Sequence, residues 1–178
     1  MVIYYKLNMF RISPVGFDDL AALIGHRNDF ETWQYLTAVI PLMPSGQMAW
    51  FESLGTDQNR QYFILSVKAV NVGMVRIDKI DRSNRSCQVG LDIFKEYRGN
   101  RYSYSGWELI LKYCFDELGM NRVWFLVLET NNIAMHTYNK IGFKREGVMR
   151  KAIYRGDRFL DYIMMSLLKE EYDSIVQR

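Results

Sequence analysis

Alternating apolar and polar positions predict strands over much of the chain. Residues 86–94 show the pattern most clearly, because positions 87, 89, 91 and 93 are apolar and the positions between them are polar or glycine. A period of two is typical of a strand that buries one face. Further strands are predicted at residues 6–12, 60–67, 72–80, 122–128, 144–154 and 159–168. Residues 68–71 and 155–157 are expected to form hairpin turns.

Apolar residues spaced three to four apart predict the helices. The longest stripe consists of Trp107, Ile110, Leu111, Cys114 and Leu118, and Gly119 is expected to end it. Ser13-Pro14 is a helix start signal. Other helices are predicted at residues 17–25, 29–36, 46–54 and 131–141. The order of elements predicts an α/β (α+β) fold with a mixed, largely antiparallel sheet.

Composition favours one domain that spans residues 1–178. Hydrophobic residues make up 49% of the 178 positions, which excludes global disorder. A net charge of only +3 gives no reason to expect a nucleic-acid partner. The chain shows neither a signal peptide nor an apolar stretch of roughly 18 residues, so we expect a cytoplasmic protein without a membrane partner. Cys87 and Cys114 have no metal-ligand spacing, which predicts two buried thiols and no metal site.

The segment at residues 129–143 is the most informative motif. Asn131 is a natural helix cap and Gly142 a natural helix stop. Between them, one face is expected to carry Ile133, Ala134, Thr137, Tyr138 and Ile141. The pattern Asn-x-x-Ala-x-x-x-Tyr-x-Lys-x-Gly-Phe resembles the last motif of the Gcn5-related N-acetyltransferase (GNAT) superfamily. The order of elements resembles this family over the whole chain, with the RimJ/RimL-like branch nearest.

The resemblance implies that the chain is an enzyme with a GNAT-like sheet covered by helices on both faces and acetyl-CoA as co-substrate. The coenzyme pyrophosphate would bind the strand–helix turn, where backbone N–H groups converge at a helix N-terminus. The residues implied for this turn are Arg98, Gly99, Asn100, Arg101, Tyr102 and Ser103. Two positions that are usually glycine in the family are Arg101 and Ser103 here, which is a departure because glycine permits positive φ.

The resemblance also places Tyr138 beside the coenzyme sulfur, as a proton donor to the departing thiolate. Helical spacing alone is equally typical of a tyrosine that packs in the core. The pantetheine arm would pair with the strand at Leu91 and Ile93, and Asn131 and Ala134 would also contact the coenzyme. An exposed N–H of this strand could stabilise the oxyanion.

The general base is open between two carboxylates, Asp92 and Glu129, each acting directly or through a water. Either carboxylate could instead be solvated or salt-bridged. His26 and His136 have a more suitable reference pKa. Their positions predict surface or capping roles for both.

Aromatic residues in the first third of the chain suggest the acceptor site. Trp33, Tyr35 and Trp50 could stack on a sugar or base, or could simply bury helices on the sheet. Arg27 could bind a phosphate bidentately. We expect a small-molecule primary amine, with a nucleotide-linked amino sugar as first choice. Protein N-termini, polyamines and a non-catalytic coenzyme-binding domain stay open, as does a homodimer.

Overall fold

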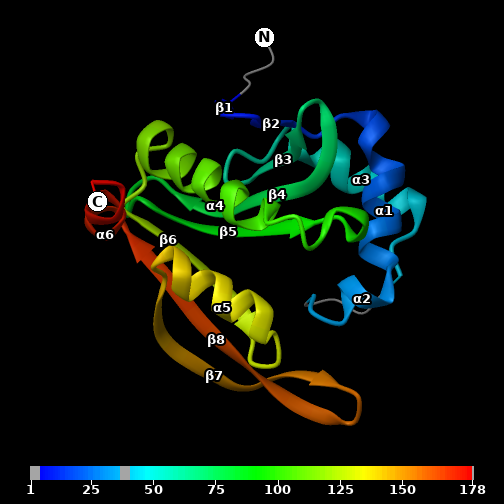
Figure 1. Ribbon diagram of the computed structural model, residues 1–178. Coiled ribbons are helices and arrows are strands. Elements are labelled where there is room, and N and C mark those ends of the chain that lie inside the picture. The colour runs from blue at the N-terminus through cyan, green and yellow to red at the C-terminus, as the bar shows by residue number, and fades with distance from the viewer. Residues whose placement is uncertain (1–4, 37–40, 178) are drawn as a thin grey trace.

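The computed structural model describes residues 5–36 and 41–177, and all its strands belong to one sheet (Figure 1). The strands are β1 Tyr5–Leu7, β2 Phe10–Pro14, β3 Gln61–Val67, β4 Val70–Asp81, β5 Ser86–Ile93, β6 Arg122–Leu128, β7 Lys144–Arg155 and β8 Arg158–Leu168. The α-helices are α1 Leu20–Asn28, α2 Phe30–Trp33, α3 Pro44–Leu54, α4 Tyr102–Lys112, α5 Asn132–Ile141 and α6 Lys169–Val176. Short helical turns lie at η1 Phe17–Asp19, η2 Lys95–Tyr97 and η3 Tyr113–Glu117.

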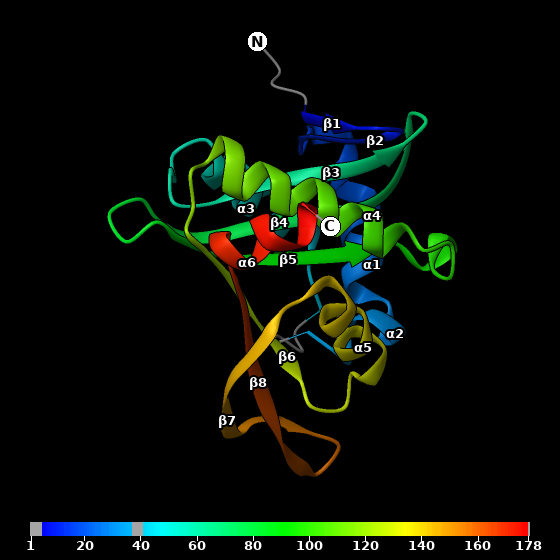
Figure 2. The same ribbon diagram turned by 60° about the vertical axis from the view of Figure 1, so that its left-hand side comes forward.

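The sheet is mixed and largely antiparallel, as predicted. Its strand order is β1-β2-β3-β4-β5-β6-β8-β7, and only β5 and β6 run parallel. These two strands pair at just three positions, from Ser86 opposite Arg122 to Gln88 opposite Trp124. Beyond Gln88 they diverge, which Figures 1 and 2 both show. The sheet therefore has a splay in its middle.

Helices cover both faces of the sheet, and Figure 2 shows α4 and α1 on opposite sides of the strands. The main core lies under α4, where Trp107 and Ile110 pack with Leu65, Val75 and Val89 of the strands. The opposite face carries a second core. That core contains Leu20 and Leu23 of α1 together with Ile64, Met74 and Phe94, with α3 residues Trp50 and Phe51 against it.

The N-terminal prediction of one strand at residues 6–12 is wrong. Asn8 adopts a left-handed conformation with φ 55°, and the chain turns back so that β1 and β2 form a hairpin. Asn tolerates this conformation better than most residues, so Asn8 is the sequence signal for the turn. Ser13-Pro14 ends β2 and starts no helix. The helical region begins after Gly16, whose N–H donates to the Asp19 carboxylate (2.8 Å).

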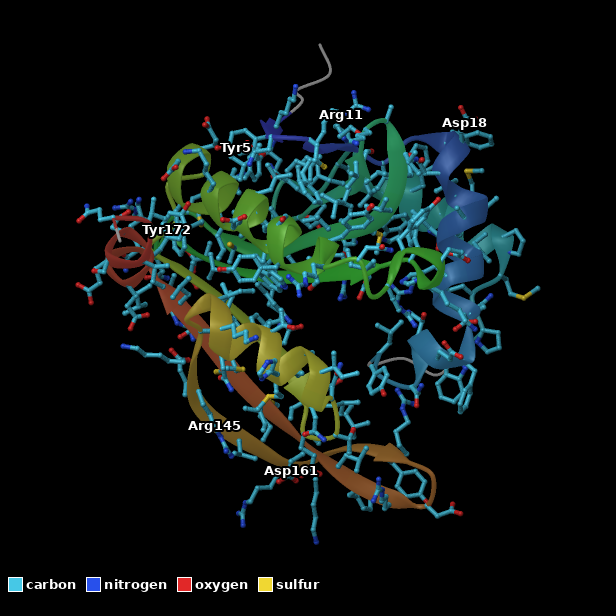
Figure 3. All side chains as sticks on the ribbon, in the orientation of Figure 1. Tyr5, Arg11, Asp18, Arg145, Asp161 and Tyr172 are labelled. Atoms are coloured by element: carbon cyan, nitrogen blue, oxygen red, sulfur yellow. The ribbon has the colours of Figure 1, made fainter. Side chains whose placement is uncertain are left out.

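Several predicted boundaries also shift, and one helix was not predicted. The α6 helix begins where the N–H of Leu168 donates to Glu171 Oε2 (2.9 Å), an acidic cap that the sequence contains. Tyr172 of α6, labelled in Figure 3, packs on Phe115 with ring centroids 4.9 Å apart. The predicted helix at 29–36 is reduced to α2, and residues 37–40 lie outside the described part of the chain.

The predicted hairpin at residues 60–80 is confirmed, with Lys68 and Ala69 in its turn at φ 47° and 69°. Cys87 and Cys114 are both free and buried, as expected. Among the described residues, none of the helices is long and apolar enough to cross a membrane.

Candidate active site

The splay between β5 and β6 leaves backbone groups of β5 without a strand to pair with. The N–H of Phe94 donates to Val72 on β4 (2.9 Å). Because N–H directions alternate along a strand, the N–H groups of Leu91 and Ile93 point the other way, toward β6. The Ile93 carbonyl accepts a hydrogen bond there from Arg98 Nε (3.2 Å). The open edge can therefore pair with an extended ligand that carries amides.

The α5 helix lies beside this open edge, and its two ends are fixed as the sequence predicts. Asn131 Oδ1 accepts a hydrogen bond from the N–H of Ala134 (3.2 Å). Gly142 ends the helix at φ 107°, and a Cβ there would lie 2.5 Å from Ile175 Cδ1. Glycine adopts this backbone conformation without strain, and a larger residue would in addition have to displace the end of the Ile175 side chain.

Tyr138 of α5 points into an aromatic cluster. Its ring centroid lies 4.3 Å from that of Phe125 on β6 and 5.5 Å from that of Trp107 on α4, and Phe143 completes the group. The predicted helix face is wrong at one position, because Ile133 is 84% exposed. Met135 packs on the core in its place, so the buried face is rotated toward Met135 and Tyr138.

The Tyr138 hydroxyl has a strongly raised pKa. Burial is the main cause, and the nearby Asp92 carboxylate raises the pKa further, while Arg76 opposes it. The hydroxyl therefore stays protonated across the neutral range and acts as a hydrogen-bond donor. Both charged groups therefore act on the titration of this hydroxyl.

Asp92 and Arg76 form an ion pair beneath the open edge of the sheet. Arg76 Nε lies 3.5 Å from Asp92 Oδ2, and both side chains are partly buried. Asp92 is the main cause of a raised pKa for Arg76. The Arg76 guanidinium lies over Gly90 of β5. A Cβ built on Gly90 would come within 2.5 Å of Arg76 Nη2. Gly90 thus makes room for the arginine.

His26 is buried, so the expectation of a surface or capping role is wrong. Its side chain is on the last turn of α1, is only 8% exposed, and packs on Phe94 with ring centroids 5.0 Å apart. Its Nε2 atom has no hydrogen-bond partner among the described residues. Burial lowers the pKa of the imidazole, although Asp92 partly opposes this. His26 is therefore a neutral imidazole on the same side of the sheet as Asp92. His136 is exposed, as predicted.

The lowered pKa of His26 predicts a loss of stability in mild acid. Above its unfolded pKa of about 6.5 the imidazole is neutral in both states, so its contribution is fully present. As the pH falls below that value, the unfolded chain binds the proton first and the free energy of unfolding decreases. Urea unfolding between pH 8 and pH 5 should show this decrease in the natural protein and a smaller one in His26→Gln. Equal decreases would show that His26 is not the cause.

The turn between β5 and α4 has two left-handed residues. Gly99 has φ 82°, and Arg101, the residue that precedes α4, has φ 60°. Arg101 thus adopts a left-handed conformation, at a cost of roughly 1–2 kcal/mol for a residue with a Cβ. Figure 1 shows this turn at the end of β5, next to α2. Its N–H groups and the N-terminus of α4 can bind a phosphate.

The comparisons with known proteins agree with this geometry. A model described as an acetyltransferase (GNAT) domain matches residues 10–144. The chain belongs to the GNAT acetyltransferase family. It is an N-acetyltransferase that uses acetyl-CoA.

This GNAT enzyme is similar to acetyltransferases that are named for different acceptors. It is 28% identical over 137 residues to "Putative ribosomal N-acetyltransferase YdaF" of Bacillus subtilis, covering 73% of this chain and 75% of the relative. It is 24% identical over 116 residues to spermidine N(1)-acetyltransferase of Escherichia coli K12, covering 65% and 62%. The structure of Vibrio cholerae spermidine N-acetyltransferase in complex with CoA and spermine matches with a TM-score of 0.88 at 20% identity, covering 93% of this chain and 99% of that one. At that identity the match confirms the fold alone.

Arg98, in the turn between β5 and α4, binds α2 within the protein. Its Nη2 donates to Thr32 Oγ1 (2.7 Å), and its Nη1 lies 3.8 Å from Glu31. Lys95 adds an ion pair with Glu31 (3.2 Å). The turn and the α2 segment are therefore held together. Asn100 donates to the Tyr97 carbonyl (3.1 Å), which stabilises the turn itself.

Glu129 does not join the cluster of Tyr138 and Asp92. Its Oε1 accepts a hydrogen bond from the N–H of Asp161 on β8 (3.0 Å). Figure 3 shows Asp161 on β8, below α5 in the view. The side chain is exposed and is directed toward the β8 backbone. Of the two candidate bases, only Asp92 is among the groups that shift the pKa of Tyr138.

The aromatic candidates for the acceptor site separate into two groups. Trp50 packs against Tyr62 of β3 with ring centroids 5.1 Å apart, which makes it part of the α3–sheet contact. The guanidinium carbon of Arg155 lies 5.4 Å from the centroid of the Trp33 ring. The Nη2 atom of Arg155 also donates a hydrogen bond to the Leu36 carbonyl. Tyr35 is 42% exposed. The α2 segment thus contacts the tip of the β7–β8 hairpin as well as the turn between β5 and α4.

Proposed function

We propose that this enzyme transfers an acetyl group from acetyl-CoA to a primary amine by direct attack of the amine. The observation that supports it most is the splay of β5 and β6, with the N–H groups of Leu91 and Ile93 on its open edge next to the Tyr138 helix. Acetyl-CoA supplies an activated thioester. The protein supplies orientation, hydrogen bonds and proton transfer.

Coenzyme binding is assigned to three segments. Backbone groups of Leu91 and Ile93 pair with the amides of the pantetheine arm. The amides from Arg98 to Ser103, including those of Gly99, Asn100 and Tyr102, bind the pyrophosphate at the start of α4. Arg101 adds a positive charge at the turn. Asn131 and Ala134 form the first turn of α5 and contact the coenzyme from the other side of the splay.

The reaction places three demands on the protein side chains and backbone. A β5 N–H donates to the carbonyl oxygen as negative charge develops on it. The amine loses a proton after attack, and the Asp92 side chain, paired with Arg76, accepts it directly or through a water. Tyr138 donates a hydrogen bond to the departing thiolate. Since burial raises its pKa well above that of a thiol, which is about 8.5 in cysteine, Tyr138 stabilises the thiolate mainly as a hydrogen-bond donor.

The acceptor is proposed to be a small molecule with a primary amine. A nucleotide-linked amino sugar loses part of its rationale because Trp50 belongs to the α3–sheet contact. Trp33 and Tyr35 on the α2 side are still candidates for contacts with the acceptor. The names of the relatives support polyamines and protein N-termini as the alternatives.

An acceptor screen with detection of released thiol tests the proposal. Acetyl-CoA is mixed with the enzyme and with amino-sugar nucleotides, polyamines, amino acids or short peptides that have free N-termini. We expect a rate of thiol release that rises with amine concentration to a plateau. This amine-dependent release should disappear when the amine is acetylated beforehand. Thiol release that no amine accelerates, from protein that binds the coenzyme, would favour a coenzyme-binding domain without transferase activity.

A further inference from the structure

A cavity of about 590 Å³ lies at the start of β3, away from the splay between β5 and β6. Its walls come from residues 61–63 of β3, from β1 and β2, from the C-terminal half of α3 and from Tyr113 of η3. Small-molecule sites are usually cavities of about 300–1,000 Å³ with mostly apolar walls and a few polar groups. None of the residues assigned to the coenzyme, the reaction or the acceptor lines this cavity.

The cavity is separate from the coenzyme site. Tyr113 follows the C-terminus of α4, whereas the turn assigned to the pyrophosphate precedes its N-terminus. Since α4 has 11 residues that rise 1.5 Å each, its two ends are about 16 Å apart. Within the sheet, β4 lies between β3 and β5, and Figure 1 shows β1, β2 and β3 together on the side away from α5. A ligand in the cavity would therefore bind in addition to acetyl-CoA.

Aromatic rings form one wall of the cavity. The Tyr113 ring packs edge to face with Tyr5 and Phe63, at centroid distances of 5.4 and 5.5 Å. Its hydroxyl donates a hydrogen bond to Gln61 Oε1 (3.0 Å), which fixes the orientation of the ring. Phe51 of α3 also lines the cavity. Rings held in this way give a flat ligand apolar surface to pack on, and the faces of the rings attract cations.

Among the described residues, two charged side chains line the cavity, and only one of them is paired. Arg60 Nε lies 3.0 Å from Asp57 Oδ2, and Arg60 Nη2 donates to Ser53 Oγ (2.7 Å). Glu52 of α3 is exposed, and within residues 5–36 and 41–177 it forms neither a hydrogen bond nor an ion pair. The lining therefore carries one uncompensated negative charge, which favours a cation over an anion.

We infer that this cavity is a second ligand site, which binds an organic monocation that joins a flat apolar ring to an ammonium group. The ring packs against Tyr113 and Phe51, and the ammonium lies at the mouth of the cavity, because Glu52 is exposed there. A polyamine fits this site less well, since a second ammonium would lie among apolar side chains such as Ile12 without a partner.

Four probes test the assignment without interference from acetyl transfer. Phenethyltrimethylammonium has the ring and the positive charge, and it has no N–H that could be acetylated. The other probes are 2-phenylethanol, 3-phenylpropionate and tetramethylammonium. Their binding is measured by ligand-observed NMR titration, with and without saturating CoA.

The cation with the ring should bind best and equally well with and without CoA. We expect it to bind roughly 3- to 30-fold tighter than the alcohol, which is the combined effect of an exposed ion pair and a cation–ring contact. Tetramethylammonium, which lacks the ring, should bind at least about 10-fold more weakly than the cation with the ring. The anion 3-phenylpropionate should bind more weakly than the alcohol.

Variants place the probe in the cavity. Glu52→Gln should lower the preference for the cation over the alcohol by roughly 2- to 5-fold. Tyr113→Leu should weaken binding of the cation more than binding of the alcohol, because leucine keeps an apolar wall but has no ring face. Glu108→Gln is the control, because Glu108 is an exposed carboxylate of α4 that does not line the cavity. It should keep the preference, and melting curves show that each variant folds.

Several results would overturn the inference. A preference for the anion would show that Arg60 decides the charge of the ligand. Equal binding of the cation and the alcohol, or an unchanged preference in folded Glu52→Gln, would exclude recognition of the ammonium by Glu52. Displacement of the cation by CoA would place it in the splay. The inference also fails if no probe binds at about 10 mM, above the millimolar dissociation constant expected for ligands of this size.

Discussion

The Tyr138→Phe variant is expected to turn over roughly 10²- to 10³-fold more slowly than the natural enzyme, the range for removing one hydrogen-bond donor to a developing negative charge. The variant removes the only polar atom of a side chain whose raised pKa keeps it a hydrogen-bond donor. The ring contacts with Phe125 and Trp107 stay in place, so folding and coenzyme binding should change little. Steady-state kinetics with saturating acetyl-CoA measure the effect.

The control for this variant is a melting curve with and without coenzyme. The phenylalanine variant should keep the melting temperature of the natural protein and the same increase with acetyl-CoA. A variant with full turnover would assign Tyr138 to core packing and remove it from the mechanism. A variant that loses both stability and turnover would leave the hydroxyl without a demonstrated role in the reaction.

The Trp107→Ala variant is expected to lose about 3–5 kcal/mol of unfolding free energy, the usual range for a buried tryptophan. Trp107 is 1% exposed and contacts Phe125, Tyr138 and Phe143, so it joins α4 to β6 and α5. The truncation leaves a cavity where the Tyr138 helix packs. Urea unfolding measures the loss, provided that the slope of the unfolding free energy against urea concentration is the same in the variant and the natural protein.

Ile133→Ala is the matched control for this variant. Ile133 lies on the same α5 helix but is 84% exposed, so its truncation should change the unfolding free energy by less than about 0.5 kcal/mol. Similar losses for the two variants would contradict the burial pattern of α5 and the position that it gives Tyr138.

Local signals predicted the elements that frame the site. Asn131 and Gly142 fix the two ends of α5 because each satisfies backbone groups within its own turn. The alternation of apolar and polar residues at positions 86–94 predicted β5, and the apolar stripe that begins at Trp107 predicted α4. These features depend on contacts within a few residues, which a sequence pattern encodes directly.

Contacts between distant segments could not be predicted in the same way. Asp92 meets Arg76 because the β4–β5 register places Gly90 opposite Arg76 and Met74 opposite Asp92, and the sequence does not reveal that register. The burial of His26 did have a signal, since Leu20, Leu23 and His26 recur every three residues along one face of α1. The place of His26 near the helix end predicts a surface or capping role, whereas its place in this three-residue repeat predicts burial.

The direct test of the central claim is the melting temperature of the protein with and without acetyl-CoA. The coenzyme is expected to bind the open edge of β5 and the turn at Arg98–Ser103, and so to stabilise the folded state. At about 100 times its dissociation constant, a ligand adds roughly 2.7 kcal/mol to the unfolding free energy. We predict a saturable increase in melting temperature, with no requirement for a metal ion. Folded protein whose melting temperature does not change at about 1 mM acetyl-CoA, where even a weakly bound ligand should register, would contradict the account.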